Sequence, residues 1–404
     1  MKEIVKGTDP GIIISLTVLT GIGMLAIYSA GTARGAEDLI VRQLFWFIAG
    51  IAVIYSAQMI PVTSLLPLSN LFYLILLLML LLVILIGSEK MGAKRWIEFG
   101  YLQFQPSEIG KFLLICTLAR YFSAGKIQWN DKKVFITGFL IAAIPSFLIL
   151  KQPDLGSAVI YMVIFLSIIY AAGLPGFHLF NISAIFFFSF AGVFGIQMYM
   201  SALIIYGVAV FKFSKKYYTA ILLILCVIGV SLSSNALWNN LKPYQQTRLL
   251  TFLDPEKFSR EGGWQVVQSK TAVFNGKLTG MGFMQGSQTQ LRFLPEGHND
   301  FIFSVIAEEF GMLGIILLMS AFSYLFYRLT KIVSKTGSRY LYLLGSGITA
   351  LIAIQTVLNI SISVGFMPVT GLPLPFVSYG GTSLIINMFM IGIVISLGKH
   401  KKNI

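Results

Sequence analysis

Apolar runs about as long as a membrane is thick recur along almost the whole chain, and this pattern limits the fold more than any motif does. They lie near 11–30, 41–59, 68–87, 107–123, 134–150, 155–173, 177–211, 217–235, 300–328, 340–363 and 375–397. A helix needs roughly 20 apolar residues to cross about 30 Å of hydrocarbon. Helices and closed barrels alone satisfy their backbone polar groups there. The pattern predicts an all-α polytopic membrane protein.

The composition excludes several other classes of protein. Of the 404 residues, 56% are hydrophobic and 11% charged, whereas soluble domains carry roughly 25% charged residues. A soluble enzyme, a disordered protein and a disulfide scaffold are therefore excluded. The net charge of +14 falls largely in short loops between apolar runs, which indicates membrane orientation and no nucleic-acid partner. Cys116 and Cys226 each lie inside an apolar run, so we expect neither a disulfide nor a cysteine metal site.

The stretch 177–211 decides the number of spans. As a single helix it would be about 50 Å long at 1.5 Å per residue, so we expect a hairpin that turns near Gly195 and Gln197. The count is then about twelve spans with both termini cytoplasmic. Every short basic cluster except Lys90, Lys94 and Arg95 then lies inside, as the positive-inside rule requires. A single span would give eleven and reverse everything after it.

These spans divide the chain into three parts. Residues 1–235 form an N-terminal transmembrane bundle, which includes a helical pair near 177–216. Residues 236–299 form one large polar extracytoplasmic loop. Residues 300–404 form the C-terminal transmembrane helices and a basic cytoplasmic tail.

Asp254 is the sharpest candidate for chemistry in the large outer loop. A carboxylate at the outer membrane surface could act as a general base on a lipid-linked substrate. Asp254 is followed by Pro255, and Asp before Pro is also typical of a helix N-cap with Pro at the first helical position. The residues alone favour the cap, although the two roles are compatible.

Ionisable side chains also stand at the outer ends of two spans. Glu108 and Lys111 are three residues apart, so they share a helix face and can pair. Ionisable groups in spans usually face the bundle interior or a wet cavity. The alternative is that the pair snorkels to the interface. Asp154 is equally ambiguous, because it could simply cap the next span.

Two further stretches combine polar residues with helix-breaking ones. His298 and Asp300 stand at the mouth of a span that continues to Glu308, Glu309 and Gly311; they either serve a site or merely start the helix. The other stretch, 359–383, contains three prolines within eight residues, together with Ser378 and Tyr379. Non-helical backbone at membrane depth requires protein or a water-filled cavity around it. A re-entrant loop and an ordinary outside loop both fit.

Six motifs in order resemble the SEDS family (shape, elongation, division and sporulation proteins), which includes RodA, FtsW and SpoVE. They cover nearly the whole chain: Gly92–Ile97, Gln105–Glu108 with Lys111, Gln152–Gly156, Tyr244–Pro255, Pro295–Phe303 and Pro368–Ser383. The stretch that begins at Gly286 looks more like the RodA branch than the FtsW branch. The family usually has ten spans, so the helical pair near 177–216 is a departure that preserves parity.

The resemblance implies a peptidoglycan glycosyltransferase that polymerises lipid II on the outer face of the cytoplasmic membrane during elongation or shape maintenance. It implies Asp254 as the catalytic base of an inverting hexosyl transfer, and a class B penicillin-binding protein as the transpeptidase partner. The expected substrate-binding residues are Glu108, Lys111, Asp154, Arg248, His298, Asp300, Ser378 and Tyr379. A divalent cation, Mg²⁺ or Mn²⁺, is compatible with the family, but the sequence contains no cluster of metal ligands.

Two other classes of function remain open. A lipid II flippase could use a cavity that Glu108, Lys111 and Asp154 face. Transporters tend to place their site near the bilayer midplane between inverted repeats, whereas no repeat is visible here and the ionisable residues gather at one face. A non-catalytic scaffold of the cell-wall machinery would need helix surfaces alone and should tolerate the loss of Asp254.

Overall fold

A computed structural model describes residues 9–36, 38–90, 93–99, 102–125, 129, 131–191, 196–214, 217–232, 238–239, 243–258 and 263–399. Two compact units make up the chain. Unit 1 comprises Met1–Ala172 and Trp264–Ile404, and unit 2 comprises Gly173–Gly263. Both chain ends, and parts of the large outer loop, lie outside the described residues.

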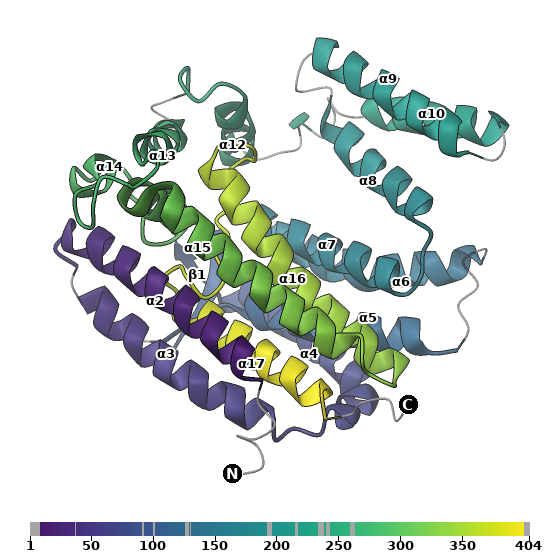
Figure 1. Cartoon of the computed structure of the whole chain (residues 1–404). Helices are drawn as coiled ribbons and strands as arrows, with labels where there is room; N and C mark the ends of the chain where they lie inside the picture. Colours follow the sequence, from purple (N-terminus) through teal and green to yellow (C-terminus); the bar gives the residue numbers. More distant parts are fainter. Residues whose placement is uncertain are drawn as a thin grey trace. The chain divides into compact units, whose positions relative to one another are not determined.

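Unit 1 is a bundle of long apolar helices (Figure 1). These are α2 (Pro10–Thr32), α3 (Asp38–Ala57), α4 (Leu65–Ile86), α5 (Pro106–Ser123), α6 (Lys132–Lys151), α7 (Leu155–Ala171), α15 (Ile302–Val333), α16 (Arg339–Ser363) and α17 (Gly381–Leu397). Three shorter helices accompany them: η1 (Val62–Ser64), α13 (Gly263–Asn275) and α14 (Ser287–Gln290). Unit 2 contains α8 (Gly176–Ala191), α9 (Ile196–Phe213), α10 (Tyr217–Leu232) and α12 (Pro243–Leu253).

Each apolar run of the sequence coincides with a helix, which confirms an all-α polytopic membrane protein. The stretch 177–211 is two helices, α8 and α9, as the hairpin requires. Of the two residues expected at the turn, Gly195 lies outside the described residues, and Gln197 lies in the first turn of α9 instead. Among the described residues, six helices are long and apolar enough to cross a membrane: α2, α3, η1 with α4, α6, α15 and α16. Shorter apolar helices occupy the other runs, except that α5 carries Glu108, Lys111 and Arg120. The count of twelve spans stays a prediction.

The helices of unit 1 pack in neighbouring pairs around a buried interior. Helix α15 packs along α2, α17 along α3, α4 along α5, and α6 along α7, while α16 contacts both α5 and α7 (Figure 1). Helices α5, α16 and α17 are buried over much of their length. Outward-facing positions of α3 and α4 are instead large and apolar, for example Val41 and Leu85. These surfaces face lipid, because apolar side chains gain nothing by leaving hydrocarbon.

A small antiparallel sheet joins α4 to α5, and the sequence patterns did not predict it. Strands β1 (Ser88–Lys90), β2 (Ala93–Phe99) and β3 (Leu102–Phe104) pair in the order β1-β2-β3. Lys90 pairs with Ala93 in the first ladder, and Phe99 with Leu102 in the second. The strands are short and carry both charged and apolar residues, so neither helical nor strand periodicity stands out. The sheet matters because β2 carries Arg95 into the bundle.

Helix α15 breaks at Gly311, where the sequence patterns suggested one continuous span. Gly311 has φ 61°, a conformation that glycine adopts at little cost. The preceding loop replaces the broken helical hydrogen bonds. Met281 N donates to the Glu308 carbonyl at 2.9 Å, and Met312 N donates to the Lys277 carbonyl at 3.0 Å. The outer part of α15 is thereby fixed to the loop instead of to its own next turn.

Unit 2 has a core of its own. Helices α8, α9 and α10 enclose Ala184, Phe188, Tyr206, Val210, Ala220 and Val227. The Tyr206 hydroxyl donates to Asn181 Oδ1 at 2.8 Å, and Asn181 Nδ2 donates to the Phe177 carbonyl at 2.6 Å. Since buried polar groups are costly unless paired, these bonds fix α9 against α8. The additional helical pair is thus packed with α10 into one compact cluster.

Candidate active site

Glu108 and Lys111 form a buried ion pair in the first turns of α5. Pro106 begins that helix and Gln105 caps it, so the two side chains project from one face. Lys111 Nζ lies 2.5 Å from Glu108 Oε1, and the two side chains are 1% and 9% exposed, respectively. Neither group therefore snorkels to an interface. A buried pair of this kind indicates a polar site inside the bundle.

Asp154 caps α7, as one interpretation of the sequence predicted, and it does more than cap. Its carboxylate accepts hydrogen bonds from Ser157 N at 3.2 Å and Ser157 Oγ at 2.8 Å. Gln105 Nε2 donates to it at 3.3 Å, and Arg95 Nη1 lies 3.8 Å away. Arg95 also donates to the Pro153 carbonyl. The cap residue therefore joins β2 and the start of α5 to the start of α7.

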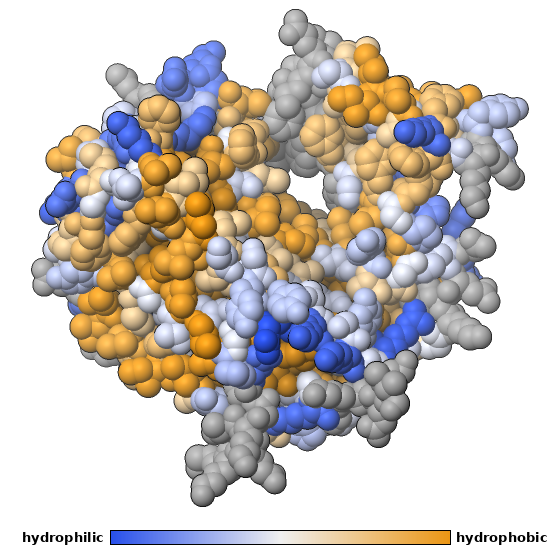
Figure 2. Space-filling model, viewed as in Figure 1, coloured by the Kyte–Doolittle hydropathy of each residue, from blue (hydrophilic) through white to orange (hydrophobic). Residues whose placement is uncertain are grey.

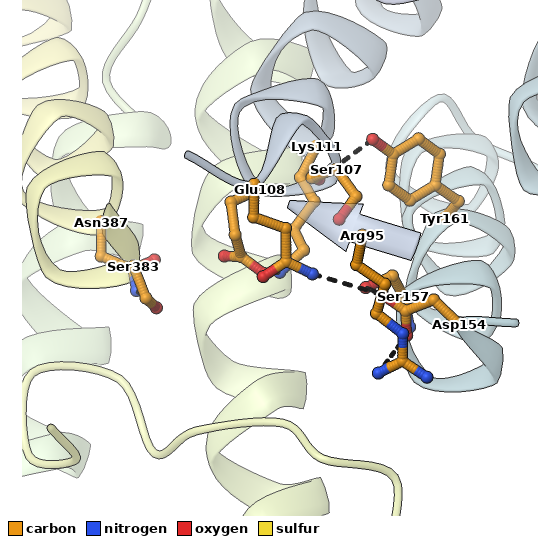
Figure 3. A network of polar contacts seen from close by, with 10 residues as sticks. Arg95, Ser107, Glu108, Lys111, Asp154, Ser157, Tyr161, Ser383 and Asn387 are labelled. Atoms are coloured by element: carbon orange, nitrogen blue, oxygen red, sulfur yellow. Dashed lines mark hydrogen bonds and ion pairs between the residues drawn. The ribbon is translucent and has the colours of Figure 1, made fainter. Parts of the chain in front are cut away.

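Figure 3 shows the Glu108–Lys111 pair and the contacts around Asp154 in one view. The Tyr161 hydroxyl donates to the Ser107 carbonyl at 3.0 Å, which ties α7 to the first turn of α5. On α17, Asn387 Nδ2 donates to Ser383 Oγ at 3.4 Å. Arg95 is the more accessible of the two cations, with a side chain 20% exposed. Its Nε atom has no partner among the described residues, so a donor remains for a ligand.

The proline-containing stretch 364–380 is non-helical, and its later part, 372–378, is largely buried. Leu372, Leu374, Phe376 and Val377 are each at most 3% exposed. Gly156 at the start of α7 lies directly against the Thr370 carbonyl, where a Cβ atom would collide. The stretch therefore enters the bundle next to the Asp154 cap. This favours the re-entrant loop over an ordinary outside loop, because buried irregular backbone requires protein around it.

This loop holds the residues that precede α15. Ser378 Oγ donates to the Asn299 carbonyl at 2.7 Å, and Tyr379 N donates to the His298 carbonyl at 2.9 Å. Asn359 Nδ2 donates to the Asp300 carbonyl at 2.9 Å. The structure thus places His298, Asp300, Ser378 and Tyr379 near one another, while their role in substrate binding stays a prediction.

His298 is the titratable group of this loop whose environment is most informative. Burial lowers the pKa of His298, and the positive charge of Arg34 lowers it too, while Glu296 acts in the opposite direction. The neutral imidazole is therefore favoured near pH 7. Its Nδ1 atom is buried and has no hydrogen-bond partner among the described residues. A ring nitrogen in this state can accept or donate a hydrogen bond to a bound hydroxyl.

Asp254 lies in unit 2, immediately after α12. Its Oδ1 accepts from Lys257 N at 3.2 Å, and its carbonyl accepts from Phe258 N at 3.3 Å. Asp254 therefore caps a single turn that begins with Pro255, and its side chain is exposed. Arg248 is half-buried on α12. These two residues belong to unit 2, and the other expected site residues belong to unit 1. Within unit 1 the latter form two groups, one around Glu108, Lys111 and Asp154 and one around His298, Asp300, Ser378 and Tyr379.

The sequence patterns undervalued a carboxylate in the broken part of α15. Glu308 is fully buried and accepts four hydrogen bonds from the start of α14. The donors are Ser287 Oγ, Gln288 N, Thr289 N and Thr289 Oγ, at 2.7–3.2 Å. Glu309 accepts from Ser29 Oγ of α2. Two adjacent carboxylates in an apolar span were the signal that could have identified this network.

We expect the Glu308→Ala variant to be markedly less stable than the parent protein. The substitution leaves up to four donors at the start of α14 without an acceptor, and each buried donor so orphaned costs about 1–3 kcal/mol. Thermal unfolding in detergent should show a lower melting temperature. Glu308→Gln retains one acceptor oxygen and should lie between the two. An unchanged melting temperature for Glu308→Ala would contradict this role.

Three buried carboxylates of unit 1 already have cationic or hydrogen-bonding partners. Glu108 faces Lys111, Asp154 faces Ser157 and Arg95, and Glu308 faces only donors. No group of three metal-ligating side chains occurs among the described residues. Glu108, Asp154 and Glu308 are thus engaged by a cation or by hydrogen-bond donors, and the divalent cation stays a prediction.

Comparisons with known proteins agree with the motifs. The model of the FtsW/RodA/SpoVE family, described as cell cycle protein, matches residues 11–212 and 198–403. The peptidoglycan glycosyltransferase RodA of Treponema pallidum is 31% identical, over 98% of this chain and 99% of the relative. The peptidoglycan glycosyltransferase MrdB of Escherichia coli K12 is 30% identical, over 98% and 94%.

Solved structures support the fold as well. A chain from a peptidoglycan synthase complex superposes with a TM-score of 0.74 at 27% identity, covering 98% of this chain and 99% of that one. The rod shape determining protein RodA of Thermus thermophilus gives 0.65 at 24% identity, over 98% of both chains. The chain therefore belongs to the FtsW/RodA/SpoVE family of cell cycle proteins, which is the SEDS family that its motifs resemble.

Proposed function

We propose that this protein is a peptidoglycan glycosyltransferase that polymerises lipid II during cell elongation or shape maintenance. Membership of the family and the names of the relatives support the activity. The mechanism rests on the exposed carboxylate of Asp254. A hydrogen bond from Lys257 N fixes this carboxylate at the start of the single turn that begins with Pro255. A general base must be both positioned and accessible to its substrate.

The chemistry that fits is one displacement with one base. Asp254 would take the proton from the acceptor 4-hydroxyl while that oxygen attacks C1 of the donor sugar. The C1–O bond to the pyrophosphate breaks, the pyrophosphate leaves with the electron pair, and C1 inverts. No second carboxylate is needed, since no water is activated as it is in glycoside hydrolysis.

The polar groups of unit 1 suit the charged and hydroxylated parts of such a substrate. Arg95 and Lys111 are cations of unit 1 that suit a pyrophosphate group, because preorganised donors act strongly on negative charge. His298 offers an unpartnered ring nitrogen to a sugar or peptide group. Arg248 of unit 2 is a further cation close in sequence to the base.

The same proposal fixes the place of action and the partner. The active site faces the extracytoplasmic side of the cytoplasmic membrane. The predicted parity of twelve spans and the positions of the basic loops support this orientation of Asp254. The partner is a class B penicillin-binding protein that crosslinks the strands. A structural relative that comes from a peptidoglycan synthase complex supports an assembly of this kind.

Purified full-length protein, assayed with fluorescent lipid II, tests the function. We expect glycan strands that lysozyme digests, formed without any other polymerase. A flippase would instead move lipid II across proteoliposomes without forming strands, and a scaffold would do neither until its partner is added. Formation of strands by the partner alone, unchanged by this chain, would contradict the proposal.

A further inference from the structure

The outer segment 274–283, between α13 and α14, exposes four large apolar side chains. Phe274 is 81% exposed, Leu278 69%, Met281 41% and Phe283 39%. None of them lies in a membrane-spanning helix. Contiguous exposed apolar surface in a polar loop marks contact with a membrane or a protein. We call this stretch the outer apolar segment.

The segment is fixed to the broken part of α15. Besides the bonds of Met281 and Met312 described above, Gly282 N donates to the Glu309 carbonyl at 3.1 Å and Leu313 N donates to the Leu278 carbonyl at 3.2 Å. Gly276 and Gly280 lie so close to the α15 backbone that a Cβ atom at either position would collide with it. The depth of the α15 break in the membrane therefore sets the depth of the segment.

The length of α15 gives that depth. The part from Gly311 to Val333 has 23 residues and is about 33 Å long at 1.5 Å per residue. This already crosses a hydrocarbon core of about 30 Å. The basic residues Lys331 and Lys335 follow at its far end, where the cytoplasmic surface lies. Gly311, and the segment attached there, must then lie at the outer edge of the hydrocarbon.

The apolar surface of the segment continues into the surface of the spans. The Phe283 ring stacks on Tyr28 of α2 with a centroid distance of 6.3 Å, and on Phe310 of α15 at 6.1 Å. Tyr28, Met312 and Leu313 are themselves exposed. In Figure 2 an apolar surface runs over α2 and α15 of unit 1. Through Phe283 the outer apolar segment therefore contacts the apolar surface of α2 and α15 directly.

We propose that the outer apolar segment is a membrane anchor that lies in the outer-leaflet interface, with its exposed side chains covered by lipid acyl chains. Aromatic residues are enriched at this depth, and a Lys beside them can extend its amine into water; Lys277 occupies that place. The occupant is lipid and not a protein because the segment continues the lipid-facing surface at the depth where α15 leaves the hydrocarbon.

Spin labels in lipid nanodiscs test the anchor. Phe274→Cys and Leu278→Cys would each be made in a Cys226→Ser background, since the other native thiol, Cys116, is buried. Ile316→Cys on the exposed face of α15 is the lipid control, and Lys257→Cys in the outer loop is the aqueous control. We expect the Phe274 and Leu278 labels to collide with an aqueous nickel chelate several-fold less often than the Lys257 label. Oxygen partitions into lipid, so it should collide with the Phe274 and Leu278 labels more often than with the Lys257 label.

Two outcomes would overturn the anchor. If both labels meet the nickel chelate as often as the Lys257 label does, the segment is in water. If both labels collide with the nickel chelate in the isolated protein, and these collisions decrease only when the transpeptidase is added, the segment is a protein interface. Melting temperatures of the labelled variants should equal that of the background, because all four positions are exposed. The test does not depend on catalysis, so its outcome is separate from that of the proposed activity.

Discussion

Asp254→Asn is expected to reduce lipid II polymerisation at least about 10²-fold, because positioned general bases contribute roughly 10²–10⁴ in rate. The substitution keeps the size of the side chain and an oxygen that can accept from Lys257 N, so the turn after α12 should persist. Asn caps helices about as well as Asp does. Expression, melting temperature and binding to the transpeptidase should therefore remain those of the parent protein.

The neighbouring carboxylate provides a matched control. Glu256 is exposed and only two residues from Asp254, so Glu256→Gln removes the same charge from the same turn. It should polymerise at nearly the parent rate. If Asp254→Asn also polymerises at that rate, Asp254 is a cap and nothing more. Equal losses in both variants would indicate that the negative charge of the turn matters, and not a particular base.

The helices could be predicted from sequence because the membrane makes hydrophobicity and length decisive. The stretch 177–211 shows this, since length alone required it to be two helices, and α8 and α9 are the result. The break in α15 could not be predicted in this way. Gly311 lies in an apolar run. The backbone groups that replace the lost helical hydrogen bonds at the break come from a loop some 30 residues earlier.

In the candidate site, too, the contacts within one helix could be predicted from sequence, whereas the contacts between distant segments could not. The Glu108–Lys111 pair and the Asp154 cap follow from spacing within one helix, and both are present. The contact of Arg95 with Asp154 joins positions 59 residues apart, through a small sheet that no periodicity announced. The acceptor role of Glu308 for the start of α14 is similarly a tertiary contact. Helix spacing and capping therefore predicted the individual polar groups, whereas their arrangement relative to one another could be seen only in the folded structure.

Lys111→Met should abolish most of the polymerisation, and a double variant can show that the cause is chemical. Lys111 is buried against Glu108, so the single substitution leaves a buried carboxylate unpaired. Breaking such a pair costs up to about 3–5 kcal/mol. The lower melting temperature expected of Lys111→Met would by itself leave a structural explanation open.

The double variant Glu108→Gln with Lys111→Met removes both charges together, and replacing a buried pair in this way is often neutral or stabilising. We expect its melting temperature to return to about that of the parent protein. Polymerisation should remain reduced on the order of 10²–10³-fold, which is the usual cost of losing one group that stabilises developing charge. Recovery of activity along with stability would mean that the pair only holds α5 in place. Loss of activity in a stable double variant would instead mean that the ammonium group acts on the substrate.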